Sequence, residues 1–405
     1  MKKTLNYLVI AGSCLLGACT QADIPVPDGP DPGPSQSTTT RVKLADALKN
    51  ADRLLELIKG PATRARTVKS VEMFGGAGTR SGESEDLYYV VNYDNDGGFA
   101  VLAADNRLCP VYAISEKGHL DMNDTTVNGG LNLFFRNLTK VPPFTKDTID
   151  LGVYPLEPVE QKIDHSYKRG PLLTEAVQLW HQSRPFNFGC PGIFESSVGC
   201  APLAMGQIMT YYEHPGSYQN TTYYWDKIKS WKDNSGMPGI QRAEGGGGLP
   251  YLLRAIGDEL HTQYGSTSST SMFAQYYQQT FQNFGYKRPA DLKVYNSSKL
   301  HELVSDRKPV LLWGESSKTT SHVWVVDGLI FDYVEYRNSL GSSYSGVGTL
   351  FHCVWGQRGG SGNGYFKLDP GTKKYVQDSN GKWKEEGDYH TQYSKINYCG
   401  DFQPQ

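Results

Sequence analysis

The chain has 405 residues, enough for two or more domains that each bury a hydrophobic core. Its formal net charge of −2 gives no overall basic face, which argues against nucleic acid as a partner. The 44 glycines and an aromatic content of 12%, with 26 tyrosines, favour a sheet-rich protein with many tight turns over a helical bundle.

The N-terminus has the features of an export signal. Two lysines precede an apolar run that is too short to span a membrane, and small residues follow it. The tetrapeptide L-G-A-C that ends at Cys19 resembles a bacterial lipobox, which implies cleavage before Cys19 and acylation of its thiol. The alternative is an ordinary secretory signal in which Cys19 has no role. We expect a lipoprotein signal peptide over residues 1–18 and an exported, membrane-anchored protein, either periplasmic or at the cell surface, that processing could release.

Residues 19–40 are rich in proline, glycine, aspartate, serine and threonine, and they contain few apolar side chains. Such a segment cannot bury enough surface to offset the entropy lost on ordering, so it predicts a disordered tether.

A small α+β unit is expected over residues 41–169. Its predicted elements are an amphipathic helix over 43–58, a hairpin of strands 86–93 and 98–104 around the turn D-N-D-G, a strand over 109–115 and a helix over 131–138. Between residues 41 and 165 there is no nucleophile–base pair and no metal-ligand cluster. The unit is therefore expected to bind rather than to catalyse.

A polar, proline-bearing segment from Pro143 to Gly170 separates this unit from the rest of the chain, and we place the domain boundary there. It ends in Lys168, Arg169 and Gly170, and an exposed basic pair is suited to proteolytic processing. A plain linker whose charges only keep it solvated is the alternative interpretation.

A buried helix is predicted from about Cys200 to Glu213. Apolar residues recur at helical spacing and a proline closes the run: Ala201, Ala204, Ile208, Tyr211 and Pro215. Cys200 stands at the N-terminus of this helix, where unpaired N–H groups and the helix dipole favour an anion, so its thiol would ionise more readily than most. A small core cysteine beneath a helix is the alternative interpretation.

The rest of the chain predicts an α+β layout of helices behind several antiparallel strands. The expected helices span residues 249–260 and 272–284, and the expected strands span 309–313, 323–326, 333–336, 349–355 and 364–368.

A nucleophilic cysteine needs an imidazole within hydrogen-bond reach. His322 is the best candidate among nine histidines, because it stands at the start of a buried strand with polar residues just before it. His352 is the second choice, although its alternating apolar neighbours favour a core position. Surface positions are the default expectation for the histidines in polar or helix-end settings: His181, His214, His261, His301 and His390.

Several motifs along the chain resemble those of the streptopain family of papain-like cysteine peptidases. They are G-C-A at 199–201, Q-I-M-T-Y at 207–211, H-P at 214–215, H-V-W-V-V-D-G at 322–328, W-G-Q-R-G-G at 355–360 and G-Y-F at 364–366. The preceding unit resembles the inhibitory propeptide of such enzymes through L-Y-Y-V-V-N-Y at 87–93 and G-F-A-V-L-A-A-D at 98–105.

The resemblance implies an α+β, papain-like fold, with a central helix packed on an antiparallel sheet, over residues 170–405. It implies Cys200 as nucleophile, His322 as general base, Gln182 and the Cys200 backbone N–H as the oxyanion hole, and Trp355 as the wall beside the imidazole. It also implies that residues 41–169 inhibit the enzyme as a propeptide, with protein or peptide substrates as partners. No metal or organic cofactor is implied.

The chain departs from the family pattern at several positions. Thr320 and Ser321 replace the two glycines that usually precede the histidine. Val354 stands where an asparagine is common, and Gln357 where a second tryptophan is usual, so a third residue that orients the imidazole is in doubt.

The sequence therefore predicts an exported bacterial cysteine endopeptidase made as a zymogen. Two other classes stay open: a catalytically silent binding or adhesion protein with the same fold, and an acyl or amide transferase that uses the same Cys–His pair. After loss of Cys14 and lipidation of Cys19, five cysteines remain, and an odd number leaves at least one thiol unpaired. We expect no disulfide in the mature enzyme.

Overall fold

The computed structural model describes residues 41–60, 66–75, 86–106, 108–121, 129–138, 161–192, 196–231, 247–265, 268–317, 320–338, 341–368, 374–377, 383–386 and 396–405. The expected signal peptide over 1–18 and the tether over 19–40 lie outside the described residues. None of the helices in the described part of the chain is long and apolar enough to cross a membrane.

The N-terminal unit, residues 41–138, is a helix packed on an antiparallel meander, followed by a second helix. Its elements are α1 Leu44–Lys59, β1 Val68–Gly75, β2 Asp86–Tyr93, β3 Phe99–Ala103, β4 Val111–Ser115 and α2 Gly129–Leu138. The predicted helix 43–58 and hairpin are confirmed. Asn95 and Asp96 take φ angles of 55° and 56° in the turn, as the D-N-D-G sequence favours.

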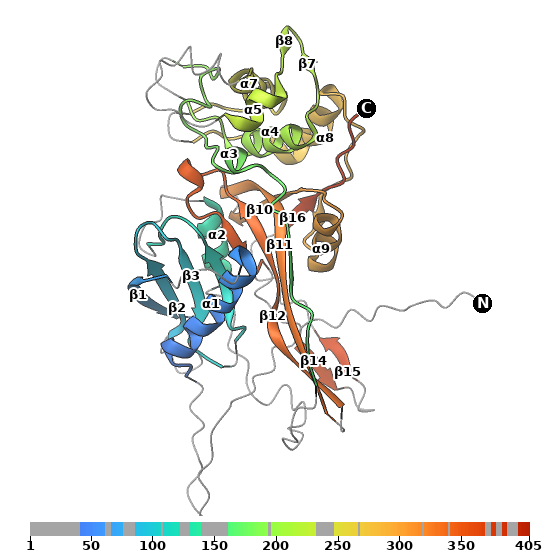
Figure 1. Ribbon diagram of the computed structural model, residues 1–405. Coiled ribbons are helices and arrows are strands. Elements are labelled where there is room, and N and C mark those ends of the chain that lie inside the picture. The colour runs from blue at the N-terminus through green and yellow to red at the C-terminus, as the bar shows by residue number, and fades with distance from the viewer. Residues whose placement is uncertain are drawn as a thin grey trace, which may run out of the picture.

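The C-terminal unit, residues 161–405, combines a helical half with the larger part of the sheet (Figure 1). Its helices are α3 Glu175–Gln178, α4 Cys200–Tyr212, α5 Trp225–Ser230, α7 Leu249–Glu259, α8 Phe273–Asn283, α9 Ser297–Ser305 and the 3-10 turn η2 Arg358–Gly360. The strands of the main sheet are β5 Gln161–Asp164, β6 Tyr167–Arg169, β9 Lys293–Val294, β10 Val310–Ser317, β11 Thr320–Asn338, β12 Gly341–Val354, β13 Gly364–Phe366 and β16 Ile396–Cys399. Two small hairpins pair β7 Ser217–Tyr218 with β8 Thr221–Thr222, and β14 Lys374–Gln377 with β15 Trp383–Glu386.

A single antiparallel sheet runs through both units. Among the described residues its order is β1-β2-β3-β4-β13-β12-β11-β10-β16-β9, and β5 and β6 pair with the outer part of β11. The two units join where β4 pairs with β13, with Ile114 opposite Tyr365. Gly364 is required at this joint, because a Cβ there would lie 2.3 Å from the Ile114 carbonyl oxygen. The N-terminal unit is thus attached by main-chain hydrogen bonds as well as by side chains.

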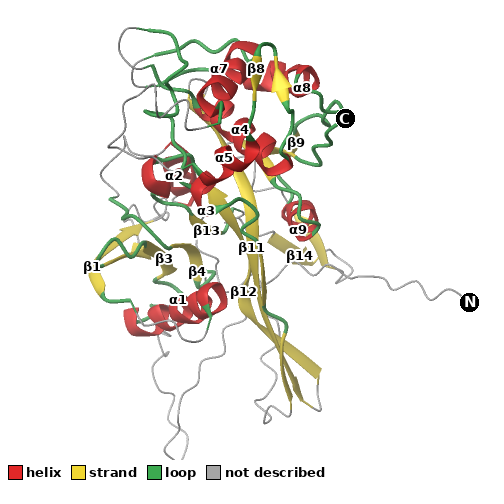
Figure 2. Ribbon diagram, turned by 45° about the horizontal axis from the view of Figure 1, so that its top comes forward, coloured by secondary structure: helices red, strands yellow, loops and turns green. Residues whose placement is uncertain are grey.

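Helix α4 is buried against one face of β10, β11 and β12, and α3, α5, α7 and α8 contribute to the same core cluster (Figure 2). Every residue from Ala201 to Thr210 is buried, which explains why the helix is apolar on all sides rather than amphipathic. The same cluster includes Leu311, Val325 and Val354 from the three strands. The predicted central helix on an antiparallel sheet is confirmed.

Two predictions about strands were wrong in detail. The expected strands 323–326 and 333–336 are parts of one long strand, β11, which forms a hairpin with β12 that extends far from the helical half (Figure 2). Residues 161–169, assigned from sequence to a polar linker, form β5 and β6 on the edge of β11. Arg169 is exposed there and Lys168 is half-buried, with its ammonium group donating to the Ile58 carbonyl.

Candidate active site

Cys200 is the first residue of α4, as predicted. The preceding Gly199 has a φ of 94°, a conformation that glycine adopts without strain, and it turns the chain into the helix. Pro202 lies in the first turn, where its missing N–H costs no hydrogen bond. The Cys200 side chain is partly exposed, and no disulfide joins the cysteines of the described residues.

Three backbone N–H groups approach the Cys200 thiol. Two come from the start of the helix, at Cys200 and Ala201, and the third comes from Val323 on β11. Burial raises the pKa of the thiol, and the three N–H groups oppose this shift without cancelling it. Val323 follows His322 on β11, so this contact brings the Cys200 thiol close to the strand segment that carries His322.

His322 is buried at 6% exposure, with two indoles beside its ring. The Trp324 ring is stacked at 6.0 Å and the Trp355 ring lies at 6.4 Å, measured between ring centroids. The His322 Nε2 atom lies 3.1 Å from the Trp355 carbonyl oxygen. A carbonyl only accepts, so Nε2 carries the proton and Nδ1 is the nitrogen left to take one from a thiol.

Sequence reasoning missed the residue that supports this carbonyl. Asn363 Oδ1 accepts from the Trp355 N–H at 3.0 Å, and Asn363 Nδ2 donates to the Gln178 carbonyl at 2.8 Å. Val354, at the position where an asparagine is common, is fully buried and cannot bond the ring. The orienting acceptor for His322 is thus a main-chain carbonyl, held in place by an asparagine eight residues later in the chain.

His352, the second choice for the base, has another role. Its Nδ1 lies 2.6 Å from Asp327 Oδ1, and both side chains are buried. Asp327 Oδ2 also accepts from the Leu173 N–H at 3.0 Å. This pair fastens the start of the C-terminal unit to β11, which agrees with the predicted core position of His352. The surface position expected for His181 was wrong, since its ring is buried against Phe186.

Gln182 lies in the loop that leads toward α4, and two hydrogen bonds join it to residues just before that helix. Its carbonyl oxygen accepts from the Val198 N–H at 2.9 Å, and its Oε1 accepts from the Ser197 hydroxyl at 3.2 Å. The structure therefore places Gln182, Cys200 and His322 on elements that meet at the start of α4. Trp355 lies beside the imidazole, as the family resemblance implied.

Helix α2 of the N-terminal unit lies directly on the imidazole. A Cβ on Gly130 would lie 2.2 Å from Cε3 of Trp355 and 2.8 Å from Cδ2 of His322, so only glycine allows this approach. Phe134, also on α2, packs against Phe366 at 5.1 Å, and Phe366 packs against Trp355 at the same distance. The N-terminal unit thus covers the candidate base with a helix.

A second contact holds α1 of the N-terminal unit to β11. Arg53 forms a two-pronged ion pair with Asp332, in which Nη2 lies 2.7 Å from Oδ2 and Nη1 bonds Oδ1. Asp332 is fully buried and also accepts from the Val347 N–H at 2.8 Å and the Ser166 hydroxyl at 3.2 Å. Removal of Arg53 would leave this carboxylate without its cation. The two units are therefore joined by strand pairing, helix packing and a partly buried ion pair.

We expect the intact chain to lose stability as the pH falls from about 6.5 toward 4. Burial lowers the pKa of His322 from its ordinary 6.5 to about 4, partly opposed by the bond to the Trp355 carbonyl. Between these values the unfolded chain binds a proton that the folded chain does not. Stability therefore rises with pH through this window, is complete above it, and is lost as the pH falls through it.

Each pKa unit corresponds to about 1.4 kcal/mol, so the melting temperature of a Cys200→Ala chain should fall clearly across this range. The control is the same chain with His322→Asn, which has no group to titrate at this position. An equal fall in both proteins would show that His322 is not the cause.

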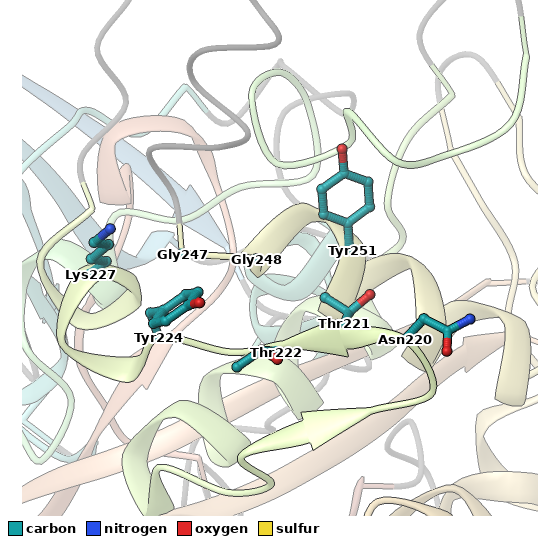
Figure 3. Close-up of a pocket in the computed structure, with 8 residues that line it drawn as sticks. All are labelled: Asn220, Thr221, Thr222, Tyr224, Lys227, Gly247, Gly248 and Tyr251. Carbon is teal, nitrogen blue, oxygen red and sulfur yellow. The ribbon is translucent and has the colours of Figure 1, made fainter.

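A cavity of about 400 Å³ lies elsewhere, between the β7–β8 hairpin, α5 and α7 (Figure 3). It is lined by Asn220, Thr221, Thr222, Tyr224, Lys227, Gly247, Gly248 and Tyr251. The Lys227 ammonium lies 5.3 Å from the centroid of the exposed Tyr224 ring. These residues include no pair of nucleophile and base.

Two protein-family models match parts of the chain. Residues 180–366 match the Peptidase C10 family, and residues 39–141 match the Spi protease inhibitor family. The first span includes Gln182, Cys200 and His322, and the second includes Arg53 and Gly130.

One sequence relative and two solved structures also resemble this chain. The thiol protease/hemagglutinin PrtT of Porphyromonas gingivalis is 25% identical over 325 residues, which cover 70% of this chain and 34% of that protein. The chain thus spans about a third of the length of this relative. A fragment of prointerpain A from Prevotella intermedia is 18% identical with a TM-score of 0.49, and the match covers 81% of this chain and 98% of the fragment. Active interpain A from the same organism is 16% identical with a TM-score of 0.36, over 57% of this chain and 94% of that one.

Proposed function

Because this chain belongs to the peptidase C10, or streptopain, family and carries an inhibitor domain of the Spi type, we propose that it is the zymogen of a cysteine endopeptidase acting through a Cys200 acyl-enzyme. The observation that carries the proposal is the meeting of the α4 N-terminus with β11, where the Val323 N–H reaches the Cys200 thiol next to His322.

The proposed reaction proceeds in two steps. The Cys200 thiol gives its proton to Nδ1 of His322, and the thiolate attacks the scissile carbonyl carbon. The Gln182 side-chain amide and the Cys200 N–H donate to the oxyanion, the C–N bond breaks, and the imidazolium protonates the leaving amine. Water, deprotonated by His322, then attacks the thioester, and the regenerated thiolate leaves with a free carboxylic acid as product. Trp324 and Trp355 pack beside the imidazole and limit the access of bulk water on that side.

The N-terminal unit is proposed to inhibit by covering and neutralising the catalytic pair. With α2 over His322, the imidazole pKa is lowered and the thiol pKa is raised, so the thiolate–imidazolium pair does not form. The described residues show no hydrogen bond between the Cys200 thiol and the His322 ring, whose Nε2 is bonded to Trp355. Removal of the unit would rehydrate the pair and allow it to ionise.

Separation of the units by cleavage at Lys168-Arg169-Gly170 remains a prediction, as does the boundary between residues 41–169 and 170–405. The structure adds a condition for cleavage at this segment. Lys168 lies opposite Ile330 in the β6–β11 ladder and Arg169 opposite Leu329, so this segment must leave β11 before it can enter an active site.

We also propose that the chain is exported and anchored through a lipidated Cys19, with an extracytoplasmic location. The support is the sequence of the N-terminus alone: two lysines, an apolar run and the tetrapeptide that ends at Cys19. Release of labelled fatty acid from wild-type protein but not from Cys19→Ala would test it.

The reaction class is tested by product analysis in ¹⁸O-labelled water. Processed enzyme acting on an unfolded protein should produce internal cuts whose new carboxyl groups carry one ¹⁸O atom, with no other product when a primary amine is added. A transferase would instead couple the acyl group to the amine, and a silent binding protein would give no cut. Processed Cys200→Ala serves as the blank, since it lacks the nucleophile.

A further inference from the structure

Ser197 lies three residues before the nucleophile and has a hydroxyl that makes two contacts. Its Oγ lies 3.2 Å from Gln182 Oε1 and 3.4 Å from the Gly199 nitrogen. The side chain is buried at 7% exposure. The serine thus bridges the candidate oxyanion residue and the turn that leads into α4.

The direction of these two hydrogen bonds follows from their chemistry. The Gly199 N–H can only donate, so the Ser197 oxygen accepts there, and its single proton is available for Gln182. The atom of Gln182 that receives this proton is the amide oxygen. The NH₂ end of the same amide is then directed away from Ser197, as an oxyanion donor requires.

The backbone of Ser197 is fixed independently of its hydroxyl. Its N–H donates to the Gly265 carbonyl at 2.8 Å, and its carbonyl accepts from the Ser269 hydroxyl at 2.5 Å. Loss of the Ser197 hydroxyl would therefore leave the loop held in place and change mainly the partner of the Gln182 amide.

We propose that Ser197 is a positioning residue that sets the orientation of the Gln182 amide for the oxyanion hole. This proposal rests on the peptidase function proposed above. The last torsion of a glutamine side chain is broad and roughly two-fold, so an amide without a partner populates both orientations. In the wrong one, the carbonyl oxygen faces the developing oxyanion and repels it. The bond from Gly199 through Ser197 also polarises the amide, which strengthens its N–H donors.

The test compares processed enzyme with Ser197→Ala, Ser197→Thr and the matched control Ser196→Ala. Ser196 is the adjacent buried serine, and its hydroxyl donates to the Pro191 carbonyl rather than to Gln182. We expect Ser197→Ala to lower kcat about tenfold with little change in KM, the scale of one lost hydrogen bond in the transition state. Ser197→Thr keeps the hydroxyl and should restore most of the activity.

The decisive measurement is a double-mutant cycle with Gln182→Ala. If Ser197 acts through Gln182, its substitution should have almost no further effect once Gln182 is alanine. The proposal is overturned if Ser197→Ala costs the same factor in both backgrounds, if Ser196→Ala costs as much, or if Ser197→Ala leaves kcat unchanged in an active enzyme. An inactive wild-type enzyme would instead contradict the proposed function.

Discussion

Processed enzyme with Cys200→Ala or His322→Ala is expected to have no measurable peptidase activity. Loss of the thiol removes the covalent route, and loss of the imidazole removes both the base that ionises the thiol and the acid that protonates the leaving amine. Gln182→Ala should keep a small but measurable activity, because losing one oxyanion donor typically costs about two to three powers of ten. The measurement is kcat/KM on a fluorogenic peptide, with active-site titration to confirm enzyme concentration.

The controls distinguish the base from other histidines. His261 is exposed, so His261→Ala should behave as wild type. His352 is bonded to the buried Asp327, so His352→Asn is expected to lower thermal stability and to leave kcat nearly unchanged in the fraction that stays folded. An active His322→Ala enzyme together with an inactive but folded His352→Asn enzyme would show that the base is assigned to the wrong residue.

Substitution of Gly130 is expected to make the uncut precursor active. A methyl group at this position overlaps Trp355 and His322, so α2 must move off the imidazole. Overpacking of this kind costs about 1–3 kcal/mol, which corresponds to a roughly 5- to 150-fold larger population of open precursor. The initial rate of Gly130→Ala precursor, measured before any fragment appears, should rise accordingly over that of wild type.

Helix propensity cannot explain such a result, because alanine favours a helix over glycine by about 1 kcal/mol and would stabilise α2 on its own. Gly216→Ala is the matched control, since a Cβ there meets nothing within 4 Å. If Gly130→Ala precursor were as inactive as wild type, α2 would not be the element that blocks the site.

The elements that could be predicted from the sequence are those whose characteristic residue pattern lies entirely within the element. Helix α4 and the β2–β3 hairpin are of this kind, because apolar spacing and turn residues define them locally. The position of Cys200 at a helix N-terminus followed from the same pattern, and His322 followed from its place at the start of a buried strand.

The failures occurred where a polar residue is buried with a distant partner. Strand β11 was divided because Asp327, Gly328 and Asp332 are typical of a turn, whereas both aspartates are buried. Asp327 is bonded to His352, 25 residues away, and Asp332 to Arg53, 279 residues away. Such pairs have no local periodicity. Strands β5 and β6 were missed for a related reason, since their short polar sequences form strands only because β11 offers an edge.

The site shows the same division. Nucleophile and base could be named from residue type and order, and the oxyanion candidate Gln182 from the resemblance to the streptopain family, whereas the groups that orient them could not. The acceptor for His322 is a main-chain carbonyl, which carries no sequence signal, and Asn363 and Ser197 are recognised only from their contacts.

The most direct test of autoinhibited Cys200 catalysis is intact-mass analysis of purified precursor incubated under reducing conditions, with and without Cys200→Ala. Wild-type precursor should begin almost inactive and gain activity as a fragment of the C-terminal unit appears, because cutting the link removes the high effective concentration of the inhibitor. The Cys200→Ala precursor should stay intact alone and be cut when active enzyme is added. Uncut wild-type precursor as active as the isolated fragment, or Cys200→Ala precursor that cuts itself at the wild-type rate, would contradict it.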